Sequence, residues 1–92
     1  MKSIAILRRA FEVIQESGLG FVVWTIYTYI FLCWQNARTE WFPIHISTFE
    51  KESGVSNRSI KKFRPALEKL GLIEYKRGTH GRLSQYKITE AK

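Results

Sequence analysis

The chain has 92 residues, of which 45% are hydrophobic and 14% aromatic. This composition excludes an intrinsically disordered chain, and the length predicts one small domain. The formal net charge of +7 lies entirely in residues 54–92, which hold ten basic and three acidic side chains, whereas residues 1–53 hold five of each. Such an asymmetry indicates a polyanionic partner, which can be nucleic acid or an anionic membrane.

The cysteine content and the apolar runs predict a cytoplasmic protein. Cys33 is the single cysteine, so it cannot form a disulfide within the chain, and its apolar surroundings predict a buried core thiol. Residues 4–7 are apolar but are followed at once by Arg8 and Arg9, which argues against a signal peptide. The apolar run 21–34 would form a helix of about 21 Å, shorter than a bilayer core of about 30 Å. A membrane span is therefore disfavoured.

Two helices are predicted in the first part of the chain. Apolar and polar side chains alternate with a helical period over residues 4–17, which predicts a helix there. Ser3 would cap this helix, and Gly18 and Gly20 would end it. Residues 21–36 are predicted to form a second helix that is apolar on most sides and must be covered on most sides. Either one compact fold or a second copy of the protein could cover it, and we predict a homodimer. The residues expected at its interface are Ile4, Leu7, Phe11, Ile14, Trp24 and Phe31.

A short strand and a short helix are predicted next. Trp41 and Phe42 favour a strand before the proline at 43. The spacing of Ser47 and Glu50 predicts a capping box at the start of a helix over residues 47–53.

A longer basic helix is predicted over residues 57–70. We expect the chain to turn at Gly54 and Val55, with Ser56 as the cap of this helix and Gly71 ending it. Its inward face would carry Ile60, Phe63, Ala66, Leu67 and Leu70. Its outward face would carry Asn57, Arg58, Lys61, Lys62, Arg64, Pro65, Glu68 and Lys69. Because Pro65 lies on the outward stripe, we hypothesise that it separates two DNA-binding turns from a final part that packs and holds the following hairpin.

A hairpin is predicted at the end. The segments "LIEYKR" (72–77) and "LSQYKIT" (83–89) have period-2 patterns, and the glycine-rich residues 78–81 would form the turn. Ile73 and Tyr75 would share a face with Tyr86 and Ile88.

The segment "FEKESGVSNRSIKKFRPALEKLGLIEYKRGTHGRLSQYKI" (49–88) resembles the winged helix-turn-helix superfamily. The resemblance implies a single α+β, mainly α, domain over 1–92 with an extra N-terminal amphipathic helix. Its parts would be the N-terminal helices for core and dimerisation (1–36), the helix-turn-helix (44–71) and a two-stranded β-wing (72–89). Glu50 and Ser53 depart from the superfamily pattern, where small and apolar residues are common, and predict looser packing of the short helix.

The resemblance implies double-stranded DNA as the partner. The superfamily serves bacterial transcription regulation and the replication, partition and transfer of phages and plasmids. Arg58 would pair with guanine and Asn57 with adenine, since such pairs are geometrically matched in the major groove. The residues expected to contact DNA are Ser47, Thr48, Ser56, Asn57, Arg58, Ser59, Lys61, Lys62, Arg64, Lys76, Arg77, Thr79, His80 and Arg82.

Other functions receive less support from the sequence. A winged helix that binds a protein partner is the first alternative, and a membrane-associated protein is the second. His45 and His80 lie 35 positions apart, and His45 is interpreted as a structural or surface residue. With no ligand cluster and no nucleophile–base set, we expect no enzyme activity, no metal and no cofactor.

Overall fold

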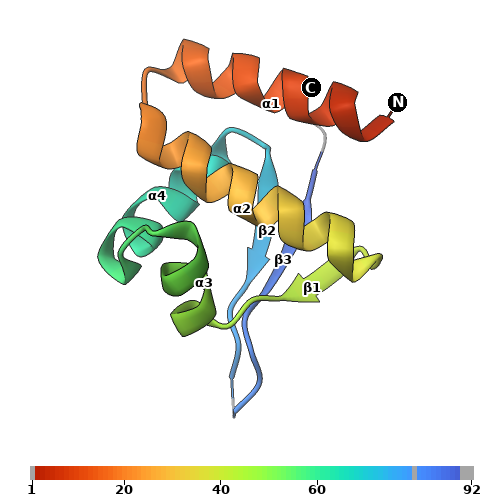
Figure 1. The fold of residues 1–92 in the computed structure, drawn as a ribbon, viewed down its shortest axis with the longest axis vertical. Coiled ribbons are helices and arrows are strands. Elements are labelled where there is room, and N and C mark those ends of the chain that lie inside the picture. The colour runs from red at the N-terminus through yellow and green to blue at the C-terminus, as the bar shows by residue number, and fades with distance from the viewer. Residues whose placement is uncertain (1, 80, 90–92) are drawn as a thin grey trace.

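A computed structural model describes residues 2–79 and 81–89 of the chain. Over these described residues the fold belongs to the α+β class and is mainly helical, with four helices and one three-stranded antiparallel sheet (Figure 1). The elements are α1 (Lys2–Ser17), α2 (Phe21–Ala37), β1 (Trp41–Pro43), α3 (Ile46–Ser53), α4 (Asn57–Lys69), β2 (Ile73–Lys76) and β3 (Gln85–Ile88). All seven predicted elements are confirmed, most of them within one residue of their expected ends.

The sheet has the order β1-β3-β2, so the last strand of the chain is the central one. Tyr86 of β3 lies opposite Tyr75 of β2 and opposite Phe42 of β1, and these side chains point inward. The pairing of β1 completes a three-stranded sheet where the sequence predicted a two-stranded wing. Since β1 directly precedes α3, the pairing of β1 with β3 places the start of α3, and α4 after it, next to the hairpin.

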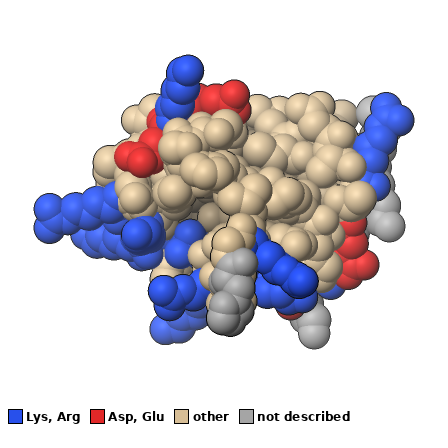
Figure 2. Space-filling view, turned by 90° about the horizontal axis from the view of Figure 1, so that it is seen from below, with Lys and Arg blue, Asp and Glu red and all other residues tan. Residues whose placement is uncertain are grey.

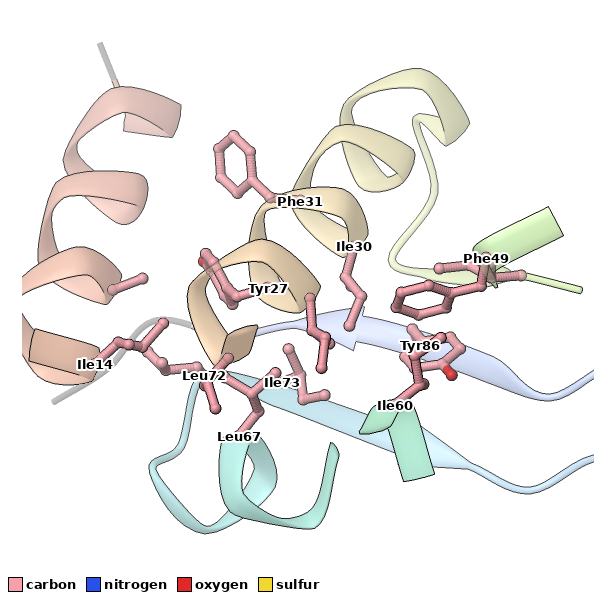
Figure 3. Packing of buried hydrophobic residues seen from close by; sticks show 14 of the residues in the cluster. Ile14, Tyr27, Ile30, Phe31, Phe49, Ile60, Leu67, Leu72, Ile73 and Tyr86 are labelled. Carbon is pink, nitrogen blue, oxygen red and sulfur yellow. The ribbon is translucent and has the colours of Figure 1, made fainter. Parts of the chain in front are cut away.

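Helix α2 is the centre of the core. Its residues Val23, Ile26, Tyr27 and Ile30 are fully buried. One side of α2 contacts α1, and its other sides contact α3, α4 and the sheet (Figure 3). The side chains that meet α2 there include Phe49, Ile60, Leu67, Ile73 and Tyr86. Elements of the same chain therefore pack around most of α2. The sequence had left this open as an alternative to a second copy.

The start of α1 differs from the prediction. The helix already includes Lys2, so Ser3 lies inside it and is not its cap. The chain turns toward α2 at the two expected glycines. Gly18 and Gly20 have φ values of 71° and 93°, a backbone conformation that is strained for residues with a side chain. Helix α1 lies across α2 at the end of the molecule opposite the hairpin loop (Figure 1).

The structure separates the six residues predicted for a dimer interface into two groups. Ile14 and Phe31 are each only 3% exposed, because they pack between α1 and α2, so they are not available to a partner in this fold. Ile4 and Phe11 are 56% and 45% exposed, and Leu7 and Trp24 are half-buried. The most exposed large apolar side chain among the described residues is instead Phe21, at 79%.

The apolar run 21–34 lies within α2. Among the described residues, none of the helices combines the length and the apolar character that crossing a bilayer needs.

Candidate nucleic-acid interface

The N-terminus of α3 is capped by a histidine. The Nδ1 atom of His45 accepts a hydrogen bond from the Ser47 amide at 3.3 Å and lies 2.7 Å from the Ser47 hydroxyl. The predicted capping box of Ser47 and Glu50 is therefore wrong. The helix begins one residue earlier, at Ile46, so Ser47 is already inside its first turn and cannot act as the cap. Thr48 is exposed on the same turn.

Glu50 and Ser53, the two departures from the superfamily pattern, build the turn between α3 and α4. The Glu50 carboxylate accepts a hydrogen bond from the Asn57 amide at 2.9 Å, so it places a negative charge at the N-terminus of α4. The Ser53 hydroxyl donates to the Phe49 carbonyl at 2.6 Å and accepts from the Val55 amide at 3.1 Å. The expectation of looser packing missed the bond between Glu50 and the Asn57 amide, because it joins groups seven residues apart that the helical period alone does not bring together.

Helix α4 presents a basic face to solvent. Ser56 caps it as predicted, accepting from the Ser59 amide at 3.2 Å, and the Ser56 and Ser59 hydroxyls bond to each other. Ile60 and Leu67 are fully buried on the inward face. Arg58, Lys61, Lys62 and Pro65 are exposed on the outward face, which confirms the predicted placement of the proline.

Asn57 is less available than expected. Its Oδ1 atom is buried and has no hydrogen-bond partner among the described residues. Bidentate pairing with adenine needs both the oxygen and the nitrogen of the side-chain amide. In this conformation Asn57 cannot make that pair, whereas Arg58 beside it is exposed.

Arg64 has its guanidinium group against the hairpin. It donates to the Tyr86 hydroxyl at 3.1 Å, and its central carbon lies 3.7 Å from the centre of the Tyr75 ring. Burial raises the pKa of the Tyr86 phenol, so this hydroxyl stays protonated at neutral pH. The side chain of Arg64 is thus half-buried between α4 and the sheet and is not a free outward cation.

The loop between β2 and β3 spans residues 77–84, longer than the predicted turn over 78–81. The Ser84 hydroxyl accepts from the Tyr75 hydroxyl at 2.9 Å and from the Gly78 amide at 3.1 Å. A Cβ atom on Gly78 would lie 2.0 Å from the Arg82 carbonyl oxygen, so only glycine allows the two sides of the loop to approach this closely. Arg77, Thr79 and Arg82 are exposed on the loop. His80, also predicted to contact DNA, lies outside the described residues.

Lys76 lies on the other face of the sheet. Its ammonium nitrogen is 4.5 Å from the centre of the Trp41 ring, beside Lys87, which bonds Glu40 at 2.7 Å. Successive side chains of a strand point to opposite faces, so Lys76 and the inward Tyr75 diverge. The structure therefore does not bring Lys76 together with the other cations predicted for DNA.

A groove of about 640 Å³ separates α4 from the hairpin loop. Four cations from three segments line it: Lys61 and Arg64 of α4, Arg77 after β2, and Arg82 before β3. None of the described residues that line it is acidic. Figure 2 shows Lys and Arg side chains gathered on both sides of the hairpin loop. The remaining walls are Ile44, His45, Ile46, Tyr75, Gly78, Leu83, Ser84 and Tyr86.

The sequence missed three polar side chains of this groove. The period-2 pattern placed Tyr75 and Tyr86 on one face but gave no reason to expect their hydroxyls to meet a cation. Ser84 carries no sequence signal for its role, because that role depends on the loop conformation.

A second polar cluster lies between α2 and α3. The Tyr29 hydroxyl donates to the Glu52 carboxylate at 2.6 Å, and burial is the main cause that raises the pKa of Tyr29. Burial also raises the pKa of the nearby Cys33 thiol, which is half-buried. A thiol with a raised pKa is a weak nucleophile at neutral pH. Within the described residues, no three His, Cys, Asp or Glu side chains lie close enough to hold a metal ion.

No family model matches the chain, and neither a curated protein nor a solved structure is significantly similar to it. The groove between α4 and the hairpin loop is therefore interpreted from its own chemistry.

Proposed function

We propose that this protein binds double-stranded DNA in a sequence-specific manner, as a winged helix-turn-helix protein. In this proposal α4 enters the major groove, and the loop between β2 and β3 acts as the wing on the neighbouring backbone. The order of the elements supports it: a short helix, a glycine turn, a basic helix and a hairpin follow one another without insertions.

The observation that carries the proposal is the basic groove. Lys61, Arg64, Arg77 and Arg82 come from separate segments and line one groove, and no acidic side chain among the described residues of the groove offsets them. Like charges that converge in this way repel each other, and a bound polyanion relieves that repulsion. A sugar–phosphate backbone, with one negative charge per phosphate, matches a groove lined by several cations.

The exposed face of α4 favours double-stranded DNA over other polyanions as the partner. The major groove is about 12 Å wide and accepts a helix of about 10–12 Å diameter. Arg58 lies in the first turn of α4, the part that reaches base edges in helix-turn-helix proteins, and it is exposed. We assign base contact to Arg58, and phosphate contact to Lys61, Lys62, Arg77 and Arg82.

A charge-matched pair of variants tests the proposal. The groove variant combines Lys61→Gln, Arg77→Gln and Arg82→Gln. The control combines Arg8→Gln, Lys51→Gln and Lys69→Gln, which removes the same charge from exposed positions outside the groove. Binding to a labelled duplex is measured by fluorescence anisotropy, after selection of preferred sequences from a random pool.

We expect the groove variant to lose roughly a hundredfold or more in affinity at low salt, since three phosphate contacts are removed, and the control to lose roughly threefold or less. Equal losses in both variants would mean that net charge alone attracts the DNA. A protein that selects no sequence and binds no duplex would contradict the proposal.

A further inference from the structure

We infer that Arg64 is a positioning residue that holds the hairpin loop at a fixed distance from α4, and not a DNA ligand. The inference rests on the proposed function for its effect on DNA, but the contacts that carry it exist in the free protein. They form a continuous path from α4 through the sheet to the loop.

The first part of the path joins α4 to two strands. The Arg64 guanidinium stacks on Tyr75 of β2 at 3.7 Å and donates to the Tyr86 hydroxyl of β3 at 3.1 Å. The two tyrosines are direct partners across the sheet, with ring centres 5.1 Å apart. One side chain of α4 therefore fixes both strands that lead into the loop.

The second part continues into the loop. The Tyr75 hydroxyl donates to the Ser84 hydroxyl, which also accepts from the Gly78 amide. These bonds clamp the two sides of the loop just beyond the ends of β2 and β3. Arg77 and Arg82 lie on either side of this clamp, so the clamp sets where their side chains face Lys61 across the groove.

The chemistry of the path requires arginine. A planar guanidinium can stack on an aromatic ring and donate an in-plane hydrogen bond at the same time, whereas the compact ammonium group of lysine cannot satisfy both partners in the same geometry. Arg64→Lys therefore keeps the charge and loses the connection. Ser84→Ala loses the clamp with no change in charge.

These two variants separate positioning from direct binding. If Arg64 positions the loop, both variants displace Arg77 and Arg82, and the slope of log K against log salt falls by up to about 1.8, about 0.9 for each lost phosphate contact. If Arg64 is instead a phosphate ligand, Arg64→Lys keeps the wild-type slope and Ser84→Ala has no effect on it.

A measurement on the free protein makes the test independent of DNA. Exchange of the Gly78 amide with solvent deuterium, followed by NMR, reports the clamp. We expect Ser84→Ala to accelerate this exchange roughly three- to tenfold, as one hydrogen bond is lost, and Arg64→Lys to accelerate it by a smaller factor. Lys69→Met, an exposed substitution on α4 outside the groove, should leave the exchange and the slope unchanged.

The two proposals fail in different ways. Wild-type protein that binds no duplex contradicts the proposed function, and the amide exchange alone then decides the role of Arg64. Unchanged Gly78 exchange in Arg64→Lys overturns the positioning role, whatever the DNA measurements give, because Ser84→Ala removes the acceptor of the Gly78 amide directly.

Discussion

The two ends of the molecule differ in what they expose to solvent. At the end formed by α1 and the start of α2, large apolar side chains are exposed, among them Phe11 and Phe21. At the end formed by α4 and the hairpin loop, the exposed side chains are mainly Arg and Lys (Figure 2). Exposed cations cost little in water, whereas exposed apolar area is unfavourable, so the two surfaces favour contacts of different chemistry.

This contrast also follows the chain. Residues 1–53 carry no net charge and supply α1, α2 and the short helix, while residues 54–92 carry the whole net charge of +7. Substitutions in the first part should change stability or association, and substitutions in the second part should change binding to DNA. The following predictions test that separation.

The largest expected effect is on stability. Ile26 of α2 is fully buried, so Ile26→Ala should lower the free energy of unfolding by about 2–5 kcal/mol through lost burial and a residual cavity. Urea unfolding followed by circular dichroism measures this loss. The DNA affinity of the fraction that remains folded should match the wild type, and a specific defect in binding would break the separation of the two ends.

The next effect is on sequence recognition. Arg58→Ala should weaken binding to the preferred duplex by roughly 1–3 kcal/mol and relax the choice at one base pair. Its thermal midpoint should stay at the wild-type value, because the Arg58 side chain is exposed. Equal weakening on preferred and random duplexes would assign Arg58 to a phosphate instead.

The next prediction tests the homodimer, whose predicted interface lies at the apolar end. Phe11→Ser should raise the dissociation constant of a dimer roughly tenfold or more, since large aromatic side chains dominate such interfaces. Sedimentation equilibrium gives this value. Leu83→Ser is the control, because Leu83 is equally exposed, at 45%, but lies at the basic end. A wild-type mass of one chain at all concentrations would contradict the dimer.

The smallest effect compares neighbouring cations. Arg77→Gln should reduce the salt slope of DNA binding by about 0.9, the value of one phosphate contact. Lys76→Gln should leave the slope unchanged, because Lys76 lies over Trp41 on the other face of the sheet. The sequence alone predicted that both residues contact DNA. Equal slopes for the two variants would remove the distinction that the structure draws between these faces.

The residues show which features a sequence can predict. Helical and strand periods placed α2, α4 and the hairpin strands correctly, since each pattern reflects a face that must be buried. Capping at α3 was predicted wrongly because Ser47 and Glu50 have the right spacing but lie two residues too late, since the observed cap is His45. The bond that Glu50 accepts from the Asn57 amide depends on the path of the turn, which no local spacing specifies.

The candidate site was predicted only in part, for the same reason. A helical wheel placed Arg64 with the other outward cations, but it cannot include the hairpin, whose Tyr86 lies 22 residues later and bonds that side chain. The sequence suggests that Pro65 separates a DNA-binding part of α4 from a part that holds the hairpin. The side chain that contacts the hairpin lies one residue before this boundary. In the structure Arg64, just before the proline, makes the connection to the hairpin.

The salt dependence of wild-type binding to a duplex tests the central claim most directly. Five cations to which we assign DNA contact are exposed at the basic end: Arg58, Lys61, Lys62, Arg77 and Arg82. With base contact by Arg58, four phosphate contacts predict that log K falls linearly with log salt with a slope of about −3.6. A slope near zero, or no binding at low salt, would contradict the claim that the basic groove holds a DNA backbone.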